Sequence, residues 1–565
     1  MAEKETKAQR VERLKREINP WEALDAIRGF AREGFSSIPP EWLGTYLRWW
    51  GVYTQGDGVG VIGGQNGEGR ALPYFMVRIR IPNGILRSNQ LRTIAALSKQ
   101  YGRGVADITV RQNIQLHWVT IEALPEVLDA LANCGLNTMG ACGDVTRNVT
   151  GCPLAGVDAE QICDASPLAL EVTRMLAGNP EFYNLPRKFK ISVSGCAVWC
   201  AYPEINDIGL TAVRRTYGGR DEIGFSLRVG GGLSTEPYLA ARLNAFVKWN
   251  QVLPVVKGIA EIFRDSDHLR EHRERARLKF LFLRHRWTAD DFLRELQKRI
   301  GFSLEPAAEE QAPVDAYRDH VGIHAQKQAG YCYVGAAVLR GRIHPEQMQV
   351  AAELADRFAD GDLRTTNMQN LLIVNVRRHD TGALARELDA VGLRIEASPF
   401  WRGAVACSGT EFCKLAITET KSFSRWLVQE LEDRLPGFDQ DLKLHVTGCP
   451  NSCGQHWIAD IGIEGKKLKV DGRMVDAYYF CVGGAVGRNQ GIARPIGYRC
   501  TAADVPDAIE RLLSTYMTAR LPGENLRRFF ARHGDEELRG FLAGQAVVAV
   551  IRDLPQGPVP RGLEG

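Results

Sequence analysis

The pattern of hydrophobic and polar positions predicts helices at the start of the chain and strands soon after. Residues 1–60 begin as amphipathic helices and then become aromatic over residues 41–55. The stretch PYFMVRIRIPNGIL alternates apolar and polar residues, as a half-buried strand does, and ends in a turn. We expect residues 1–65 to form an arm that packs over the body of the protein.

The pattern then changes period twice. Helical periodicity over residues 88–101 is followed by strand-like alternation over residues 107–119 and by a second helical stretch over residues 124–134. A β-α-β-α order of this kind is typical of a ferredoxin-like half-domain. We expect one over residues 66–140.

The sequence also repeats itself at a nearly constant offset. TVRQN at Thr109 recurs as TNMQN at Thr366, 257 residues later, and VGG at Val229 recurs at Val482, 253 residues later. The same offset, within two residues, relates Arg147, Cys152, Cys196, Cys200, Asp207 and Gly209 to Arg402, Cys407, Cys449, Cys453, Asp460 and Gly462. The repeat predicts an internal duplication, joined by a charged helical connector over residues 268–299. The two halves should pack around a pseudo-two-fold axis with a cofactor at their interface.

Composition indicates the class of the protein and the cellular compartment in which it works. A chain of 565 residues is too long for a single core, and its 45% hydrophobic and 24% charged residues are ordinary for a globular protein. Thirteen cysteines, an odd number, argue against a secreted disulfide scaffold and for reduced thiols in the cytoplasm. We expect no signal peptide and no membrane span, because residues 1–30 mix acids and bases and no apolar run is long enough. The net charge of +4 indicates no nucleic-acid partner, and we expect a monomer.

Four cysteines of the second half carry the strongest chemical signal. Five residues separate Cys407 from Cys413, three separate Cys449 from Cys453, and 35 lie between the two pairs. Four thiolates are the outer ligands that a cubane iron-sulfur cluster requires. Zinc sites favour pairs two to four residues apart on both sides, which the first pair does not match. A structural zinc site or buried free thiols are the alternatives.

The first half keeps only part of this pattern. Cys152, Cys196 and Cys200 stand at corresponding places, but Asp158 stands where a partner for Cys152 would be, and Cys163 is the spare thiol nearby. We interpret these cysteines as relics of the duplication or as packing residues. A second cluster is the alternative.

Cations follow the opposite distribution. The first half carries a basic set made of Arg78, Arg111, Arg147, Lys188 and Lys190. The second half has lost two of these cations, because Met368 stands in place of Arg111 and Asp441 in place of Lys188. Alternation places Lys188 and Lys190 on one face of a strand, which is unfavourable unless an anion lies between them. A solvated surface is the alternative.

The four-cysteine pattern, with Gly448 and Pro450-Asn451 around the third ligand, resembles the siroheme-containing sulfite and nitrite reductases over residues 45–520. The resemblance implies that a 4Fe-4S cluster is held by the four cysteines and that Cys453 also binds the siroheme iron. It implies that the substrate anion, on the open face of the siroheme, is surrounded by Arg78, Arg147, Lys188 and Lys190. It also implies siroheme contacts from Arg111, Gln115, Arg187 and Asn451.

On this resemblance the fold is α+β and duplicated, with two ferredoxin-like half-domains and two siroheme and iron-sulfur α/β domains. We expect the siroheme- and anion-binding domain over residues 141–310, the second ferredoxin-like half-domain over residues 318–396, the 4Fe-4S and siroheme domain over residues 397–540, and a C-terminal tail over residues 541–565.

The resemblance implies an assimilatory enzyme that reduces sulfite to sulfide, or nitrite to ammonia, with six electrons. The chain has no flavodoxin-like block and no dinucleotide fingerprint, so its electrons must come from a separate protein, which the resemblance identifies as ferredoxin. Lys190 favours sulfite, because members specialised for nitrite tend to carry Asn there, whereas EIND at residues 204–207 resembles the nitrite branch. We expect sulfite and keep nitrite as the alternative. Remoter alternatives are a precorrin-3B synthase-like oxygenase and a non-enzymatic iron-sulfur protein.

Overall fold

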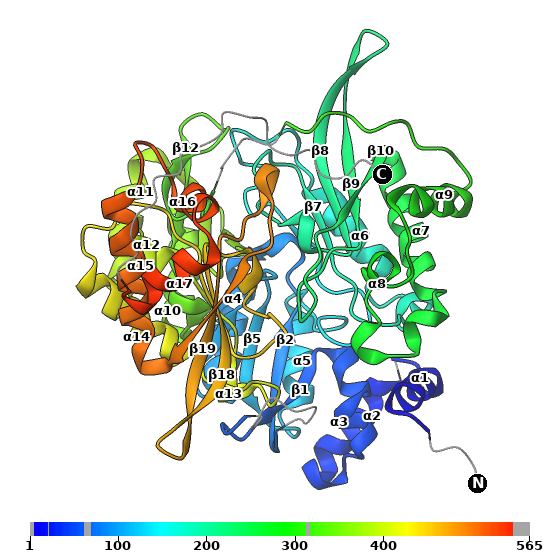
Figure 1. Ribbon diagram of the computed structural model, residues 1–565. Helices are drawn as coiled ribbons and strands as arrows, with labels where there is room; N and C mark the ends of the chain where they lie inside the picture. Colours follow the sequence, from blue (N-terminus) through cyan, green and yellow to red (C-terminus); the bar gives the residue numbers. More distant parts are fainter. Residues whose placement is uncertain (1–4, 21, 61–68, 312–316, 546–565) are drawn as a thin grey trace.

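A computed structural model describes residues 5–20, 22–60, 69–311 and 317–545 (Figure 1). These residues form four five-stranded sheets, two in each half of the chain, with helices packed against them. No helix in the described part of the chain is both long and apolar enough to cross a membrane.

The N-terminal segment forms a small helical unit at one end of the molecule (Figure 1). It contains α1 (Lys7–Glu17), α2 (Ala23–Glu33) and α3 (Pro40–Gly44). The aromatic rings that follow are buried, and the Trp49 ring lies 5.6 Å from that of Tyr183 in the body. Buried Lys15 of α1 also reaches the body, where its Nζ donates a 2.8 Å hydrogen bond to the carbonyl oxygen of Leu185.

The first ferredoxin-like sheet has the strand order β1-β2-β5-β4-β13. Its first-half elements are β1 (Val52–Gly56), β2 (Ala71–Ile79), β4 (Ala106–Ile108), β5 (Ile114–Val119), α4 (Ser88–Tyr101) and α5 (Leu124–Asn133). The helix predicted over residues 88–101 is confirmed. The single strand predicted over residues 107–119 is wrong, because the chain turns between β4 and β5, where Gln112 takes a left-handed φ of 60°. The sheet also begins at β1, inside the stretch that we expected to belong to the arm.

The second ferredoxin-like sheet has the order β11-β12-β15-β14-β3. Its second-half elements are β11 (Gly322–Ala325), β12 (Tyr331–Ala336), β14 (Asp362–Thr365), β15 (Leu371–Arg377), α10 (Pro345–Phe358) and α11 (Thr381–Ala390). The two sheets exchange an edge strand: β3 (Ile85–Arg87) of the first half pairs with β14, and β13 (Arg342–Ile343) of the second half pairs with β4. Each sheet is therefore completed by the other half.

The two α/β domains share one sheet topology. The strand orders are β10-β9-β8-β7-β6 and β16-β17-β18-β19-β20. The first three strands of each domain along the chain are parallel, and the last two are antiparallel to their neighbours. The strands of the first are β6 (Thr150–Gly151), β7 (Ile191–Ser194), β8 (Ile208–Tyr217), β9 (Arg220–Val229) and β10 (Ala241–Lys248). Those of the second are β16 (Ala404–Ala406), β17 (Leu444–Thr447), β18 (Ile461–Val470), β19 (Arg473–Val482) and β20 (Arg494–Thr501).

Helices of the α/β domains supply the rest of each core. They are α6 (Ser166–Leu176), α7 (Val252–Arg264), α8 (Phe280–Leu283) and α9 (Ala289–Ile300) in the first, and α12 (Pro399–Gly403), α13 (Gly409–Phe412), α14 (Lys421–Arg434), α15 (Val505–Ala519), α16 (Leu526–Arg532) and α17 (Asp535–Ala543) in the second. Phe280 and Leu281 of α8, and Phe292 and Leu296 of α9, are buried in the first core. Residues 268–299 are thus part of a domain, and the connector predicted there is wrong.

Unusual backbone conformations confirm the duplication. Left-handed φ angles of 60° and 62° occur at Gln112 and Gln369, and angles of 59° and 54° at Trp199 and Ser452. Residues other than glycine adopt this region rarely, so its recurrence at the repeat offset reflects a common architecture. The two halves therefore repeat each other in conformation as well as in sequence.

Candidate active site

The four second-half cysteines gather at one edge of their sheet. β16 and β17 are parallel, so their carboxyl ends meet, and the loops that follow carry Cys407 and Cys449. Cys413 directly follows α13, and Cys453 lies four residues beyond Cys449. Burial, with the neighbouring charges of Cys453 and Cys407, raises the pKa of Cys413 to about 12, which indicates that these thiols lie close together. Among the four, Cys453 is the exposed one.

The surroundings of these sulfurs fit a cluster better than a single zinc ion. Backbone N–H of Gly448 donates to Cys407 Sγ at 3.2 Å, and the Asn451 amide donates to Cys449 Sγ at 3.5 Å. Two sulfurs on one zinc lie at most ~4.6 Å apart, because each Zn–S bond is ~2.3 Å long. Among the described residues, no three of these four cysteines lie within 4.8 Å of one another. A cluster, in which each thiolate binds a different iron, allows this wider spacing.

Arg78 and Arg147 are held side by side. Arg78 on β2 is paired in register with Gln115 on β5, and its Nε and Nη2 donate to Gln115 Oε1 at 2.8 and 2.6 Å. Arg78 and Arg147 both donate from Nη1 to the carbonyl oxygen of Ala141, at 3.3 and 3.1 Å. Arg147 is held further by the carbonyl oxygen of Gly143, at 2.9 Å. These contacts fix both guanidinium groups without pairing either with a carboxylate.

Lys188 and Lys190 lie in an extended segment that leads into β7. Phe189, between them, is fully buried and bridges to Thr146, so the two lysines flank a core residue. This places them just before the strand, where alternation still directs both away from the core. Neither ammonium group makes a hydrogen bond or ion pair within the described residues.

Electrostatics link these cations to the cluster edge. Burial lowers the pKa of Lys188 to about 7, against the attraction of the Cys453 thiolate. Burial also lowers the pKa of Lys190 well below its usual range, and the neighbouring charges of Arg277 and Arg111 add to the effect. Burial opposes the charge of Arg78, but its pKa is raised by Cys142 and Tyr53 and, to a smaller extent, by Cys453 and Cys413. The basic set and the thiols therefore form one site, whose surplus positive charge suits an anionic cofactor and an anionic substrate.

The residues expected to contact siroheme lie around this set. Arg111 donates to Asn206 Oδ1 at 2.8 Å and to the carbonyl oxygen of Asn148 at 2.6 Å, while its buried Nε has no partner among the described atoms. Burial lowers the pKa of Arg111 to about 9, and Arg147 adds to the shift. Arg187 is partly committed elsewhere, because its Nη1 donates to Asp144 Oδ1 at 3.2 Å.

Sequence reasoning missed Arg277. Its Nη2 donates to Asp207 Oδ2 at 2.8 Å, and the backbone N–H of Lys190 donates to the same oxygen at 2.8 Å. Arg277 thus holds the carboxylate that positions Lys190. It lies in the charged run that we interpreted as a connector. Only its burial in the folded protein distinguishes it from a solvated residue.

Comparison with known proteins also identifies two kinds of domain, each present twice in the chain. The model of the nitrite and sulphite reductase 4Fe-4S domain matches residues 142–304 and 398–545. The model of the nitrite/sulfite reductase ferredoxin-like half domain matches residues 69–134 and 324–391. Both models match twice, in alternation, as the duplicated fold requires.

Individual relatives extend over most of the chain. The assimilatory ferredoxin-dependent nitrite reductase of Haloferax mediterranei is 36% identical over 543 residues, covering 91% of this chain and 89% of that protein. The sulfite reductase [ferredoxin] of Mycobacterium tuberculosis is 35% identical over 541 residues, covering 94% and 95%. The solved structure of the Mycobacterium tuberculosis NirA protein superposes with a TM-score of 0.88 at 35% identity, covering 94% of this chain and 97% of that chain.

The fold, the four thiols and the adjoining cations agree with these matches, which also support siroheme and a 4Fe-4S cluster as the cofactors. The chain therefore belongs to the nitrite and sulphite reductase family, as a ferredoxin-dependent oxidoreductase.

Proposed function

We propose that this enzyme reduces sulfite to sulfide, with ferredoxin as its electron donor. The observation that carries the choice of sulfite is the pair of ammonium groups of Lys188 and Lys190 beside Arg78, Arg147 and Cys453, because neither has a partner among the residues that the structure describes. Sulfite carries up to two negative charges and nitrite one, so an additional cation favours sulfite. Ferredoxin is named for the relatives of both kinds. Its thirteen free cysteines support a cytoplasmic location, where thiols stay reduced.

We assign binding of the anion to four cations of the first half, which are Arg78, Arg147, Lys188 and Lys190. When bound, siroheme coupled to the 4Fe-4S cluster supplies the electrons that no side chain can store. Arg78 and Arg147, fixed by the carbonyl oxygen of Ala141, orient the anion with charge-assisted hydrogen bonds. Contacts of this kind contribute ~1.5–3 kcal/mol each. We assign the siroheme carboxylates to Arg111 and Arg187, with Gln115 and Asn451 as polar contacts.

The lysines are the better proton donors. Cleavage of each S–O bond leaves charge on an oxygen that must take up protons, and a donor acts best with a pKa near the working pH. Lys188, with its pKa lowered to about 7, meets this condition. An anion placed beside the ammonium group raises that pKa again, so substrate binding would itself load the lysine with a proton. The guanidinium groups keep their protons and stabilise charge instead.

The EIND segment is the observation that favours nitrite, together with the Haloferax relative. Its side chains support a positioning role that does not depend on the anion. Asn206 accepts from Arg111, Asp207 holds the backbone of Lys190, and Glu204 accepts from the backbone N–H of Gly487 in the second half. Because this segment acts through Lys190 and Arg111, we give Lys190 the greater weight.

The test is a steady-state assay of both anions, with reduced ferredoxin or methyl viologen as donor. We expect a higher kcat/KM for sulfite than for nitrite. A preference for nitrite would overturn the choice of substrate, and turnover of neither anion would favour a precorrin-3B synthase-like oxygenase. The absorption spectrum of the purified protein provides the control, because siroheme gives a Soret band and a red band that a bare cluster lacks.

A further inference from the structure

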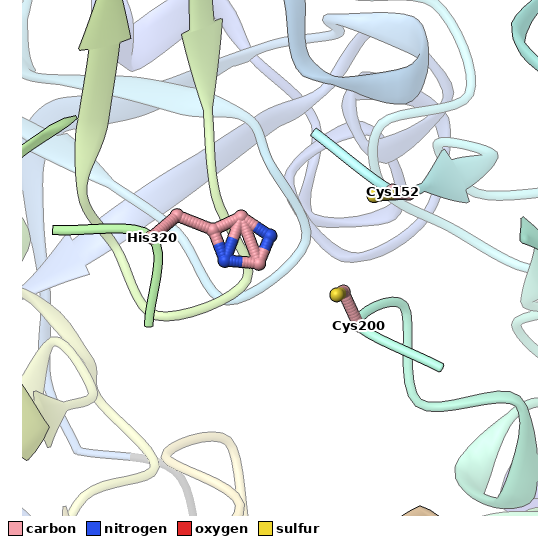
Figure 2. Close-up of side chains that lie close together, drawn as sticks. All are labelled: Cys152, Cys200 and His320. Atoms are coloured by element: carbon pink, nitrogen blue, oxygen red, sulfur yellow. The ribbon is translucent and has the colours of Figure 1, made fainter. Parts of the chain in front are cut away.

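The first half contains a second group of thiols, at the place that corresponds to the cluster ligands. Cys152 follows β6, and Cys196 and Cys200 follow β7, as Cys407, Cys449 and Cys453 follow β16 and β17. The sulfurs of Cys152 and Cys200 and a ring nitrogen of His320 all lie within 4.8 Å of one another (Figure 2). Cys196 Sγ lies 3.5 Å from Cys200 Sγ, and all four side chains are buried.

His320 is oriented as a metal ligand is. Its Nδ1 lies 3.1 Å from the carbonyl oxygen of Arg318, which can only accept, so Nδ1 carries the proton and Nε2 has a free lone pair. Nε2 is buried and has no hydrogen-bond partner among the described atoms. A carbonyl that fixes the tautomer in this way is typical of histidines that bind metals. A bound metal ion would satisfy the nitrogen, which otherwise costs ~1–3 kcal/mol to bury.

We propose that Cys152, Cys196, Cys200 and His320 bind a single structural zinc ion. Three thiolates and one imidazole form a common set of tetrahedral zinc ligands, with bonds of ~2.3 Å to sulfur and ~2.0–2.1 Å to nitrogen. The 3.5 Å between Cys196 and Cys200 fits two sulfurs on one ion. Cys200 connects the set, because its sulfur lies within 4.8 Å of those of both Cys152 and Cys196.

A second 4Fe-4S cluster fits this geometry poorly. Its four thiolates would each bind a different iron, whereas here two sulfurs share a 4.8 Å group with the His320 ring and the third lies 3.5 Å from Cys200. Asp158 stands where the second half has Cys413, and its carboxylate is engaged in a 2.7 Å ion pair with Arg318. The duplication has therefore left a smaller site, into which the second half inserts His320 as the fourth ligand.

The surroundings indicate a closed, structural site. Apolar side chains enclose the thiols, including Leu154 and Val157 of the first half and Leu372 and Val374 of the second. Three thiolates on a divalent ion leave one net negative charge, and the Arg318 guanidinium interacts electrostatically with Cys152 and Cys200. The ion would thus connect the first α/β domain to the second half of the chain. This role is separate from the reduction of sulfite or nitrite.

The first test measures metals in the purified wild-type holoenzyme. We expect about one zinc per chain by mass spectrometry, together with about five irons from one cluster and one siroheme. Zinc-edge X-ray absorption should give about three sulfurs at ~2.3 Å and one nitrogen at ~2.0–2.1 Å. The proposal fails if the chain holds its iron but no zinc, if a disulfide joins Cys196 and Cys200, or if about nine irons and eight sulfides reveal a second cluster.

The second test removes single ligands. Cys200→Ser and His320→Gln should each lose most of the zinc while the Soret band per chain shows that the protein has folded. Cys134→Ser is the matched control, because its thiol is half-buried and donates only to the carbonyl oxygen of Leu131. If His320→Gln and Cys200→Ser both retain one zinc per chain, these residues are not its ligands. A variant that fails to fold leaves the wild-type measurement to decide.

Discussion

Gln112 and Gln369 donate hydrogen bonds across the junction of the two halves in opposite directions. Gln112 Nε2 donates to the carbonyl oxygen of Thr365 at 3.1 Å, and Gln369 Nε2 donates to that of Ile108 at 2.8 Å. Their side-chain oxygens accept from backbone N–H groups of their own halves, at 3.1 Å from Gly151 and 3.0 Å from Ala406. Each glutamine thus ties a ferredoxin-like sheet to an α/β domain and to the opposite half.

Removing either glutamine should weaken this junction. Gln112→Ala and Gln369→Ala each leave buried backbone groups without partners, at a cost of ~1–3 kcal/mol. We expect each substitution to lower the apparent Tm by several degrees at a fixed scan rate. Gln349→Ala, on the exposed face of α10, should leave it unchanged. An unchanged Tm in both junction variants would contradict the role given to these hydrogen bonds.

Substitution of Lys190 tests the choice of substrate. Lys190→Asn should lower kcat/KM for sulfite by ~10- to 100-fold, because one charge-assisted contact of ~1.5–3 kcal/mol is lost, and should spare nitrite. The measurement is a steady-state assay of both anions with the same donor. Lys257→Asn, on the half-exposed surface of α7, is the control. Equal losses for the two anions would refute a specific role of this lysine.

The pH profile tests Lys188 as a proton donor. A donor is active while protonated, so kcat/KM should fall as the pH rises through the pKa of Lys188. We expect this fall between about 7, the value that burial produces, and the ordinary 10.5, because the bound anionic cofactor opposes the effect of burial. Lys188→Gln should lower kcat and abolish this alkaline limb. Nitrite is the suitable substrate, since its charge stays constant in this range.

If Lys188 had only a structural role, Lys188→Gln would lower the rate without changing the shape of the pH profile. The same profile recorded for Lys257→Gln serves as the control, because that lysine lies outside the site. An alkaline limb that persists in Lys188→Gln would assign the proton to another donor.

The cluster ligands can be tested by chemical analysis. Cys453→Ser should abolish assembly of the cluster or its coupling to siroheme, because a hydroxyl is a poor ligand for a soft metal. Iron and acid-labile sulfide should fall by about four atoms each per chain where assembly fails, and six-electron turnover should be lost in either case. Cys134→Ser should retain both contents. If Cys453→Ser kept the cluster and full turnover, the assignment would be wrong.

Features with a local or repeated signature could be predicted from the sequence. The helix over residues 88–101 follows from its periodicity, and the duplication from several matches at one offset. The four cysteines carry their own spacing, and the parallel pair β16 and β17 then brings their loops together. In each case the decisive information lies within a short stretch or is present twice.

Features that depend on distant contacts could not be predicted. No motif in the sequence marks His320 as a ligand, and only the packing of the second half against the first places it beside Cys152 and Cys200. Arg277 lies among other charges, and nothing nearby in the sequence indicates that Asp207 will bind it. The exchanged strands β3 and β13 have three and two residues, too few for a periodic pattern to be visible.

The exchange of β3 and β13 also constrains the history of the chain. A single ancestral half could have completed its five-stranded sheet only by receiving that edge strand from a second copy of itself. The ancestor before gene duplication is thus implied to be a strand-swapped homodimer with two equivalent sites. Fusion of the two copies would have released them from identity, so that the cysteines and the cations of the two halves could diverge.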